Sequence, residues 1–509
     1  RPGEIVVQCN DQTHRVQGDL FDFLQALLNR FSFDSFGDGL PVCAGLFGYL
    51  AYDLKNRIEA LPVTCMDTFL PDLCLYAPSV ILIQDQQTGK THLCIPEFFQ
   101  GPGEKPFQKS HSQIQAFFWD KISTSAKQGS FCLADQELTS CFTRSEYIAS
   151  VRKIIAYLKA GDIYQANLSQ RFEAGFQGDA YALFLELFRR NPAPFFSYVR
   201  AVDHTIVSSS PERFIQQTGR DVETRPIKGT IARGTIQAAD SKNRAILEQS
   251  AKDDAELTMI VDLMRNDLSR VTVHGSVVVS EHKRIEPYEN VFHMVSVVNG
   301  TLSADKTAVD LIKATFPGGS ITGCPKIRAM EIIDELEPVK RHVYTGSIGY
   351  ISFHDTMDLS IAIRTATIVG NRIFFSVGGG IVYDSDPERE YQETLDKGKT
   401  LMETLSGQEI CVRKNSAKAW VNGRIVDQSQ ARVPAASPGF QYGAGVFETI
   451  RVDRGRVFRL TAHVARMSAA WKALFNESFP DITWKAVIDQ LIGANQFQDT
   501  VAAVKLLAA

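Results

Sequence analysis

The sequence lacks the features that mark several large classes of protein. Lys and Arg number 54 against 58 Asp and Glu, so the basic excess typical of nucleic-acid binding is missing. No apolar run reaches the roughly 18–20 residues that span a bilayer, and the first residues contain no apolar signal core. We therefore expect no nucleic-acid partner and no membrane association.

Cysteine is present but not organised. The nine Cys residues are odd in number and form no CxxC pair, which disfavours a zinc site or a disulfide framework. Scattered reduced thiols indicate a cytoplasmic protein. Nucleotide-binding signatures are also missing, because Cys324-Pro325 stands where a P-loop would carry Lys-Ser/Thr.

The length of 509 residues predicts two or three domains. The polar stretch 406–418 has no apolar periodicity, so we interpret it as a linker between a large segment, 1–405, and a short one, 419–509. Local signals in the large segment predict both helices and strands. These signals are a capping box at Thr143–Glu146 with a stop at Gly161, a cap at Asp253 or Asp254, a helix over 387–405, and a tight turn at Gly370-Asn371.

The tight turn sets the expected fold class. It joins apolar stretches at 359–368 and 372–377, and strands joined in this way are antiparallel. An α+β fold with antiparallel sheet is therefore expected rather than a doubly wound parallel fold. The same turn predicts that Arg364 lies opposite Val377.

Acidic residues on two predicted helices are candidate ligands for a hard cation. Glu390, Glu393 and Lys397 fall on one helical face, and two carboxylates one turn apart suit Mg²⁺. The alternative is a solvated acidic face with a helical ion pair. Glu256 leads an apolar helix, where it either needs a partner or metal or complements the helix dipole.

Two further segments could bind or attack a substrate. Arg364 and the glycines at 378–380 could form a carboxylate pocket, or be an edge-strand Arg beside a bulge. The Gly-rich stretch 316–326 precedes a helix whose N-terminus could bind an anion. Lys228, between Ile and Gly, is either an ordinary surface Lys or, if desolvated, a nucleophile.

Taken together, these segments resemble the chorismate-utilising enzyme family. The matching motifs run in family order over about 140–405, and residues 1–140 resemble the family's N-terminal part less distinctly. The motifs are Tyr164-Gln-Ala-Asn-Leu, Ser209-Ser-Pro-Glu212, Arg225-Pro-Ile-Lys-Gly-Thr, Ile260-Val-Asp-Leu-Met-Arg-Asn-Asp, Phe292-His-Met-Val-Ser, Phe316-Pro-Gly-Gly-Ser-Ile-Thr-Gly-Cys-Pro-Lys, Thr345-Gly-Ser-Ile-Gly-Tyr and Gly378-Gly-Gly-Ile-Val.

Lys228 suggests the branch of the family. Pro-Ile-Lys-Gly-Thr resembles aminodeoxychorismate synthases, whereas anthranilate synthases typically carry Ala in place of this Lys. The resemblance implies that Lys228 attacks C2 of chorismate as the C4 hydroxyl leaves, and that ammonia then adds at C4 and displaces the lysine. The expected product is 4-amino-4-deoxychorismate, a precursor of 4-aminobenzoate and folate.

The resemblance also implies roles for the other candidate residues, within a two-sheet antiparallel sandwich with outer helices. Glu212 would protonate the departing hydroxyl. Residues implied as Mg²⁺ ligands are Glu256, Glu390 and Glu393. Residues implied to bind or line the substrate are Thr230, His293, Tyr344, Arg364, Gly378, Gly380 and Lys397, with no proton transfer assigned to His293.

The segment 419–509 resembles the start of class IV pyridoxal-phosphate enzymes, and in particular 4-amino-4-deoxychorismate lyases. The motifs are Ala419-Trp-Val-Asn-Gly-Arg, Gly439-Phe-Gln-Tyr-Gly-Ala-Gly-Val-Phe-Glu-Thr and Phe458-Arg-Leu-Thr-Ala-His-Val-Ala-Arg466. Arg466 would contact the phosphate of pyridoxal phosphate. The Schiff-base lysine of that family lies beyond these motifs. The resemblance therefore implies a fusion of a synthase with the first part of a lyase, in which pyridoxal phosphate would bind only if the domain were complete, and lyase activity from this sequence is disfavoured.

Alternatives remain open at this point. They are an anthranilate synthase component I, which Lys228 disfavours, and a non-catalytic chorismate-binding scaffold, which the retained carboxylates disfavour. No Gly-x-Cys-x-Gly glutaminase signature is visible. The resemblance therefore implies a separate glutamine amidotransferase subunit that supplies ammonia.

Overall fold

The structure is a computed structural model that describes most of the chain. The described residues are 4–9, 12–34, 39–65, 70–96, 111–123, 129–134, 138–234, 237–288, 291–406, 418–427, 446–495 and 501–508. They form two compact units, Arg1–Glu409 and Ile410–Ala509. Residues 407–417 of the expected linker lie outside the described residues.

Two antiparallel sheets build the larger unit, with eight and nine strands in the described residues. The eight-stranded sheet runs β10 (Phe195–Arg200), β11 (His204–Ser210), β20 (Thr365–Val369), β21 (Arg372–Ile381), β9 (Gln165–Gly178) and β17 (Gly323–Cys324), with β7 (Phe131–Leu133) and β8 (Thr139–Ser140) also paired to β9. The nine-stranded sheet runs β14 (Ile227–Ala232), β16 (Val291–Thr301), β13 (Asp221–Arg225), β12 (Arg213–Thr218), β19 (Thr356–Ile361), β18 (Ser347–Ser352), β3 (Gly45–Leu50) and β4 (Leu73–Tyr76), with β15 (Val278–Pro287) paired to β16. The expected α+β fold with antiparallel sheets is confirmed.

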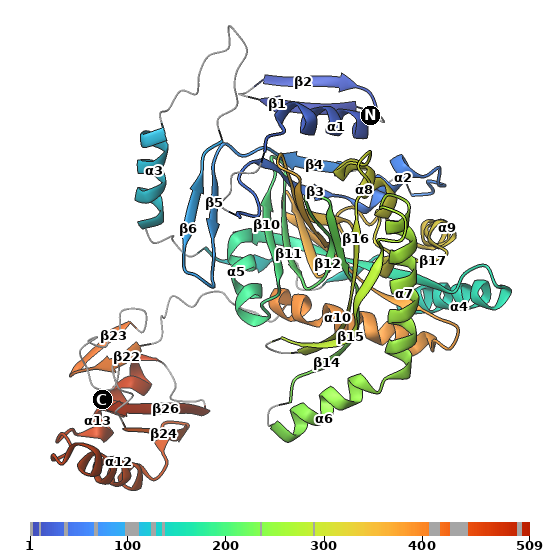
Figure 1. Cartoon of the computed structure of the whole chain (residues 1–509). Coiled ribbons are helices and arrows are strands. Elements are labelled where there is room, and N and C mark those ends of the chain that lie inside the picture. The colour runs from blue at the N-terminus through green and yellow to red at the C-terminus, as the bar shows by residue number, and fades with distance from the viewer. Residues whose placement is uncertain are drawn as a thin grey trace. The chain divides into compact units, whose positions relative to one another are not determined.

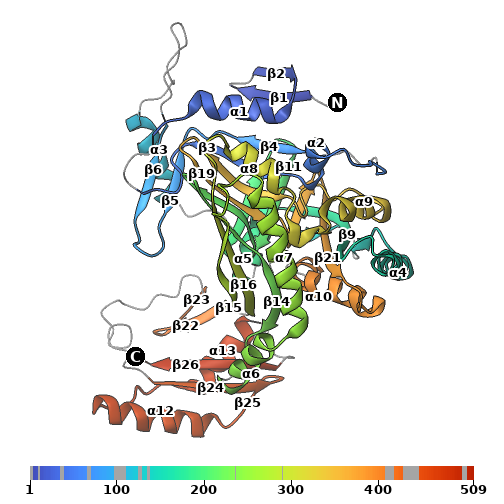
Figure 2. The same cartoon turned by 45° about the vertical axis from the view of Figure 1, so that its right-hand side comes forward.

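Helices flank both sheets (Figures 1 and 2). Those that contact the eight-stranded sheet are α4 (Arg144–Ala160), α5 (Ala180–Arg190), α9 (Lys326–Leu336) and α10 (Pro387–Ser406). Those that contact the nine-stranded sheet are α6 (Gln237–Glu248) and α7 (Ala251–Ser269), and α8 (Ala308–Thr315) packs on α7 and α1 (Leu20–Phe31). A buried cluster joins the sheets, since it combines Tyr49 and Ile348 of one with Ile206 of the other.

The chain passes directly from a strand of one sheet to a strand of the other at two neighbouring places. Pro211 and Glu212 connect β11 to β12, and residues 362–364 connect β19 to β20. Hydrogen bonds tie the crossings together, because the Ile361 N–H donates to the Glu212 carbonyl at 3.0 Å and the Ser209 N–H donates to the Arg364 carbonyl at 3.1 Å. Glu212 and Arg364 therefore both lie at this junction.

This junction corrects one prediction from the sequence. The stretch 359–368 is not one strand, because Arg364 has a left-handed φ of 51° and separates β19 from β20. Arg364 is therefore not paired with Val377, because the pairing of β20 with β21 ends at Ala366 and Phe375. The hairpin itself is confirmed, since Val369 lies opposite Arg372 across the Gly370-Asn371 turn.

The helix ends predicted from the sequence are confirmed in α4 but not in α7. The capping box at Thr143 is present, and Gly161 ends α4 with a left-handed φ of 83°. The cap predicted at Asp253 or Asp254 is wrong, because α7 begins earlier and the Ser250 hydroxyl accepts the hydrogen bond from the Asp253 N–H. Serine fits this position because its short side chain reaches the free N–H groups of the first turn.

The smaller unit is a separate α+β structure. Its strands are β22 (Lys418–Val421) paired with β23 (Arg424–Asp427), and the sheet β25 (Arg456–Val457), β24 (Val446–Asp453) and β26 (Val501–Ala508). Its helices are α12 (Leu460–Phe475) and α13 (Trp484–Ala494). Ile450, Met467 and Ile488 are buried at the centre of this unit, so β24, α12 and α13 share one small core.

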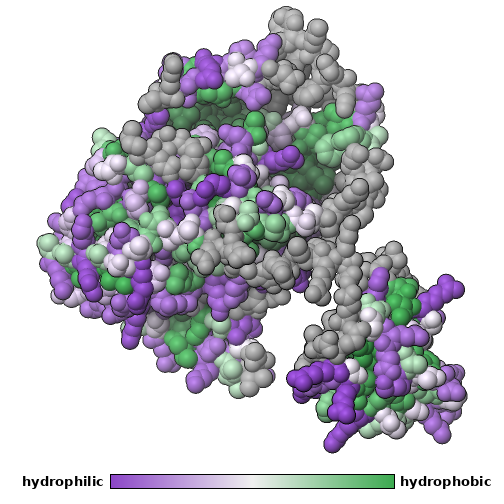
Figure 3. Space-filling view, turned by 180° about the vertical axis from the view of Figure 1, so that it is seen from behind, coloured by the Kyte–Doolittle hydropathy of each residue, from purple (hydrophilic) through white to green (hydrophobic). Residues whose placement is uncertain are grey.

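The remaining described elements are the short helix η2 (Gly319–Ile321) and, in the first 123 residues, β1 (Glu4–Cys9), β2 (Gln12–Gln17), η1 (Tyr52–Leu54), α2 (Lys55–Ile58), β5 (Ile81–Gln84), β6 (Thr91–Cys94) and α3 (His111–Ser123). Figure 3 shows hydrophilic side chains around separate hydrophobic groups on one face of the molecule. Among the described helices, none combines the length and the hydrophobicity that a membrane crossing requires.

Candidate active site

Lys228 and Glu212, the predicted nucleophile and acid, meet at a third residue, Ser320. Ser320 belongs to the short helix η2 (Gly319–Ile321) within the Gly-rich segment. The Lys228 Nζ donates to the Ser320 carbonyl oxygen at 3.3 Å. The Ser320 hydroxyl donates to Glu212 Oε1 at 2.7 Å. One residue therefore contacts both reactive groups, and the sequence analysis did not single it out.

Burial changes the proton affinity of both reactive groups. Glu212 is 6% exposed, and its burial raises the pKa of its carboxyl group, although Ser320, Lys228 and Arg364 act in the opposite direction. Burial also lowers the pKa of the Lys228 ammonium group, and Glu256 opposes this change. Both shifts favour a protonated acid beside a neutral amine, which is the pairing that acid-assisted nucleophilic attack requires.

A bulge in β14 follows Lys228. The pairing with β16 slips between Lys228 and Thr230, and Gly229 adopts a left-handed φ of 78°. A Cβ at Gly229 would lie 2.8 Å from a Leu247 methyl carbon, so only Gly fits without a shift of its neighbours. The bulge and the close approach of Leu247 thus explain why a glycine follows Lys228 in the sequence.

Thr230 and His293 form a pair beside Lys228. The Thr230 hydroxyl lies 2.8 Å from His293 Nδ1, on adjacent strands. Burial lowers the pKa of His293 to about 4, so its imidazole is neutral near pH 7. A neutral imidazole is consistent with the prediction that His293 lines the substrate pocket and transfers no proton during the reaction.

Three side chains of α10 converge on Gly379 of β21. A Cβ placed at Gly379 would lie 3.4 Å from Glu390 Oε2, 3.6 Å from Glu393 Oε1 and 3.8 Å from Lys397 Nζ. Lys397 also pairs with Glu393 at 2.7 Å and donates to the Gly378 carbonyl at 3.2 Å. The helical ion pair expected as one alternative is therefore present, but Glu390 is not part of it.

Glu390 and Glu256 each carry an oxygen without a hydrogen-bond partner. Glu390 is 4% exposed; Ser385 donates to its Oε1 at 2.6 Å, while its Oε2 has no such partner among the described residues. Burial raises the pKa of Glu390. On α7, Glu256 Oε1 is also buried without a hydrogen bond, and Lys252 Nζ lies 3.8 Å away.

These carboxylates fit a hard cation in kind, because Mg²⁺ takes carboxylate oxygens and an unsatisfied buried oxygen is costly without a partner. Within the described part of the chain, however, no three His, Cys, Asp or Glu side chains already lie close enough to hold a metal ion. Oxygens from outside the protein would have to complete the shell.

Gly378 and Gly380 lie opposite β9, where they pair with Ser169 and Asn167. A Cβ at Gly380 would lie 2.5 Å from Gln165 Nε2, so the bare backbone makes room for this side chain. Both amide atoms of Gln165 and the Asn167 Oδ1 are buried with no hydrogen-bond partner in the described residues. The sequence analysis missed these two amides, although both lie in the motif that begins at Tyr164.

Tyr344 and Arg364 are the predicted ligands of the enolpyruvyl carboxylate. Tyr344 is buried, and burial raises the pKa of its phenol, which therefore stays neutral. Arg364 lies at the sheet crossing, close enough that Glu212 and Arg364 influence each other's pKa. Their role as carboxylate ligands stays a prediction.

In the smaller unit, Arg466 projects from α12. Its Nε and Nη2 donate to Glu448 at 2.8 and 3.0 Å, and the hydrogen bonds from Arg466 and His463 lower the pKa of Glu448 to about 2. Residues 439–445 of the motif used for the class IV resemblance lie outside the described residues. The predicted phosphate contact of Arg466 stays a prediction.

Comparison with known proteins defines the family. Residues 3–403 match the chorismate binding enzyme family, and residues 445–509 match the class IV aminotransferase family. The chain therefore belongs to the chorismate binding enzymes.

Individual relatives agree with this placement. Aminodeoxychorismate synthase component 1 of Escherichia coli (strain K12) is 42% identical over 405 residues, which cover 79% of this chain and 86% of that protein. Anthranilate synthase component 1 of Cereibacter sphaeroides is 35% identical over 430 residues, covering 81% and 86%. The crystal structure of anthranilate synthase component I from Streptococcus pneumoniae superposes with a TM-score of 0.67 at 29% identity, covering 78% of this chain and 90% of that one.

Proposed function

We propose that this chain converts chorismate and ammonia to 4-amino-4-deoxychorismate. The observation that carries the proposal is the placement of Lys228 and Glu212 on the same residue, Ser320, at the crossing of the two sheets. Among the relatives reported above, the aminodeoxychorismate synthase component 1 is more similar to this chain than the anthranilate synthases are.

The proposed reaction uses the two groups in one step. The neutral Lys228 amine forms a bond to C2 of chorismate, both conjugated ring double bonds shift by one position toward C4, and the C4–O bond breaks. The proton of Glu212 leaves with the departing oxygen as water, because hydroxide alone is a poor leaving group. Ammonia then bonds to C4, both double bonds shift back, and the Lys228 amine is released from C2, so the enolpyruvyl group is retained.

We propose Glu256, Glu390 and Glu393 as the Mg²⁺ ligands. When bound, the cation would neutralise the ring carboxylate and hold it in a fixed orientation. The support is the pair of buried oxygens without hydrogen bonds on Glu256 and Glu390. Other proposed contacts of the substrate are those of Thr230, His293, Tyr344, Arg364, Lys397 and the backbone of Gly378 and Gly380.

The ammonia source is proposed to be a separate glutamine amidotransferase subunit, in keeping with the "component 1" in the names of the relatives. A cytoplasmic location is proposed because the cysteines of the described residues are free thiols. The linker is proposed at 406–418. In the smaller unit, Arg466 is proposed to contact the phosphate of pyridoxal phosphate once it separates from Glu448.

A mass-resolved product assay tests the function. The chain is supplied with chorismate, Mg²⁺ and ammonium, and the expected product gains an amine while keeping the enolpyruvyl group. Conversion of that product to 4-aminobenzoate by an added lyase establishes the amine at C4. Formation of anthranilate and pyruvate would instead overturn the proposal in favour of anthranilate synthesis.

A further inference from the structure

The segment that carries Ser320 is held at the C-terminal end of η2 by hydrogen bonds from Arg341 and from β9. Arg341, itself buried, donates from Nη1 to the Ile321 carbonyl at 3.0 Å. The Asn167 N–H of β9 donates to the Thr322 carbonyl at 2.8 Å. These bonds hold the backbone of the segment independently of the Ser320 side chain.

The segment also packs closely against α7. A Cβ at Gly319 would lie 2.5 Å from a methyl carbon of Leu263 and 2.6 Å from the Met264 methyl carbon. No larger side chain fits there, so the backbone next to Ser320 is confined between α7 and β9. A confined backbone gives Ser320 a defined position relative to β14 and to the sheet crossing.

Ser320 uses different atoms for its two contacts. Its carbonyl oxygen accepts from Lys228, and its hydroxyl donates to Glu212, although these residues lie 92 and 108 positions away in the sequence. Lys228 comes from the nine-stranded sheet and Glu212 from the crossing. Lys228 and Glu212 do not lie on one strand, so the backbone hydrogen bonds of a strand do not fix the distance between their side chains. Ser320 connects the two side chains directly.

We propose that Ser320 is a positioning residue that holds the Glu212 carboxyl group and the Lys228 amine in the relative geometry required when C2 is attacked and the C4–O bond breaks. This inference rests on the proposed function. In that step the amine gains a bond to C2, and the Glu212 proton leaves with the C4 oxygen as water. Ser320 itself exchanges no proton with the substrate.

Because Ser320 contacts Lys228 through its carbonyl oxygen and Glu212 through its hydroxyl, one substitution can remove the second contact and keep the first. Ser320→Ala removes the bond to Glu212 but keeps the carbonyl that accepts from Lys228. A group displaced by about 1 Å can lose roughly 100-fold in rate. We therefore expect kcat with chorismate and ammonium to fall by about 10- to 100-fold, with KM changed less than about threefold, because the proposed role of Ser320 acts through Glu212 and Lys228 and not through the substrate.

Ser360→Ala is the matched control. Ser360 of β19 is 1% exposed and its hydroxyl donates to the Ile348 carbonyl at 3.0 Å, so this variant also removes a buried hydroxyl that donates one hydrogen bond, with no predicted effect on kcat. Ser320→Thr keeps the hydroxyl and should recover most of the lost rate. Ser320→Cys, nearly the same size with a weaker donor, should fall between Ala and wild type.

The outcomes separate this inference from the proposed function. If the wild-type chain forms no aminodeoxychorismate, the proposed function fails. If the wild type is active but Ser320→Ala and Ser360→Ala have equal kcat, or if Ser320→Ala changes only KM, the positioning role is overturned. Should Ser320→Ala not fold by thermal melting, the Cys and Thr variants decide: equal kcat in Ser320→Cys and wild type would overturn the role.

Discussion

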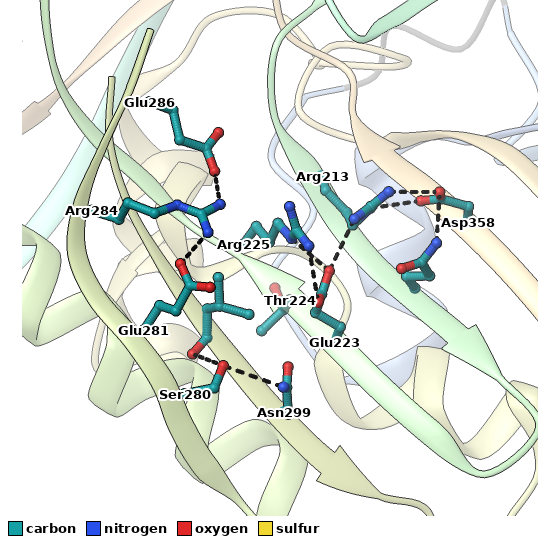
Figure 4. Close-up of polar contacts among 12 residues, drawn as sticks. Arg213, Glu223, Thr224, Arg225, Ser280, Glu281, Arg284, Glu286, Asn299 and Asp358 are labelled. Atoms are coloured by element: carbon teal, nitrogen blue, oxygen red, sulfur yellow. Dashed lines mark hydrogen bonds and ion pairs between the residues drawn. The ribbon is translucent and has the colours of Figure 1, made fainter. Parts of the chain in front are cut away.

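Two groups of charged residues in the larger unit differ in how their charges are paired. A charged ladder runs across the nine-stranded sheet (Figure 4) and consists of Arg213, Glu223, Arg225, Glu281, Arg284, Glu286 and Asp358. Its members are paired with one another: Arg213 reaches Glu223 at 2.9 Å and Asp358 at 3.0 Å, and Arg284 contacts Glu281 and Glu286. The ladder is complete without a ligand.

The candidate site differs from the ladder at Glu390. Its Oε2 is buried with neither a hydrogen bond nor an ion pair among the described residues. Glu256 Oε1 in the site and Glu281 Oε2 in the ladder also lack a hydrogen bond, but each lies in an ion pair, with Lys252 and Arg284 respectively. Leaving a buried acceptor unsatisfied costs roughly 1–3 kcal/mol or more for a charged group. The charge left open at Glu390 therefore marks a place for a ligand, whereas the charges of the ladder are paired with one another.

Among substitutions of charged residues, the largest loss in the free energy of unfolding is expected where a paired charge is fully buried. Arg341 and Glu337 lie 2.7 Å apart and are almost inaccessible to solvent. Arg341→Met leaves the Glu337 charge without its cation, and we expect the free energy of unfolding to fall by about 3–5 kcal/mol. Chemical denaturation of both proteins measures this difference. A loss below about 1 kcal/mol would show that the pair does not stabilise the fold.

The next effect concerns an open charge. Glu390→Gln removes a proposed cation ligand, and we expect Mg²⁺ affinity to fall at least about tenfold, by analogy with the losses seen when metal-site residues are changed. Competition with Mn²⁺, followed by electron paramagnetic resonance, reads the affinity without relying on turnover.

Glu403→Gln, on the same helix and exposed, is the control for that measurement. Its affinity for Mg²⁺ should match that of the wild type. Equal affinities of Glu390→Gln and Glu403→Gln would remove Glu390 from the ligand set.

The smallest effect is expected in the ladder. Arg284 is 42% exposed, and exposed ion pairs contribute only about 0–1 kcal/mol. Arg284→Gln should therefore lower the free energy of unfolding by no more than about 1 kcal/mol and leave kcat unchanged. A clear loss of synthase activity in this variant would contradict the division between scaffold charges and site charges.

The sequence predicted those parts of the fold that depend on neighbouring residues. The Thr143 capping box and the Gly370-Asn371 turn are confirmed because each is determined within a few residues. The single strand expected through Arg364 was wrong, because the departure from β19 depends on pairing with distant strands of the other sheet. Apolar residues on both sides of Arg364 gave no local sign of the crossing.

The same limit applies to the site. Lys228, Glu212 and the acidic residues of α7 and α10 were recognisable by residue type and motif. Ser320 was not, because its role depends on contacts with residues about a hundred positions away. Its motif was noted for its glycines, whose packing against α7 explains why that segment is tightly confined.

The central claim is that Lys228 forms a bond to the substrate, and the mass of the peptide that contains Lys228 tests it most directly. The chain is incubated with chorismate and Mg²⁺ without ammonia, quenched, and digested. The account predicts a peptide that contains Lys228 and is heavier by one chorismate less one water, and no such peptide in Lys228→Ala. An adduct on another residue, or an active enzyme that never carries one, would contradict it.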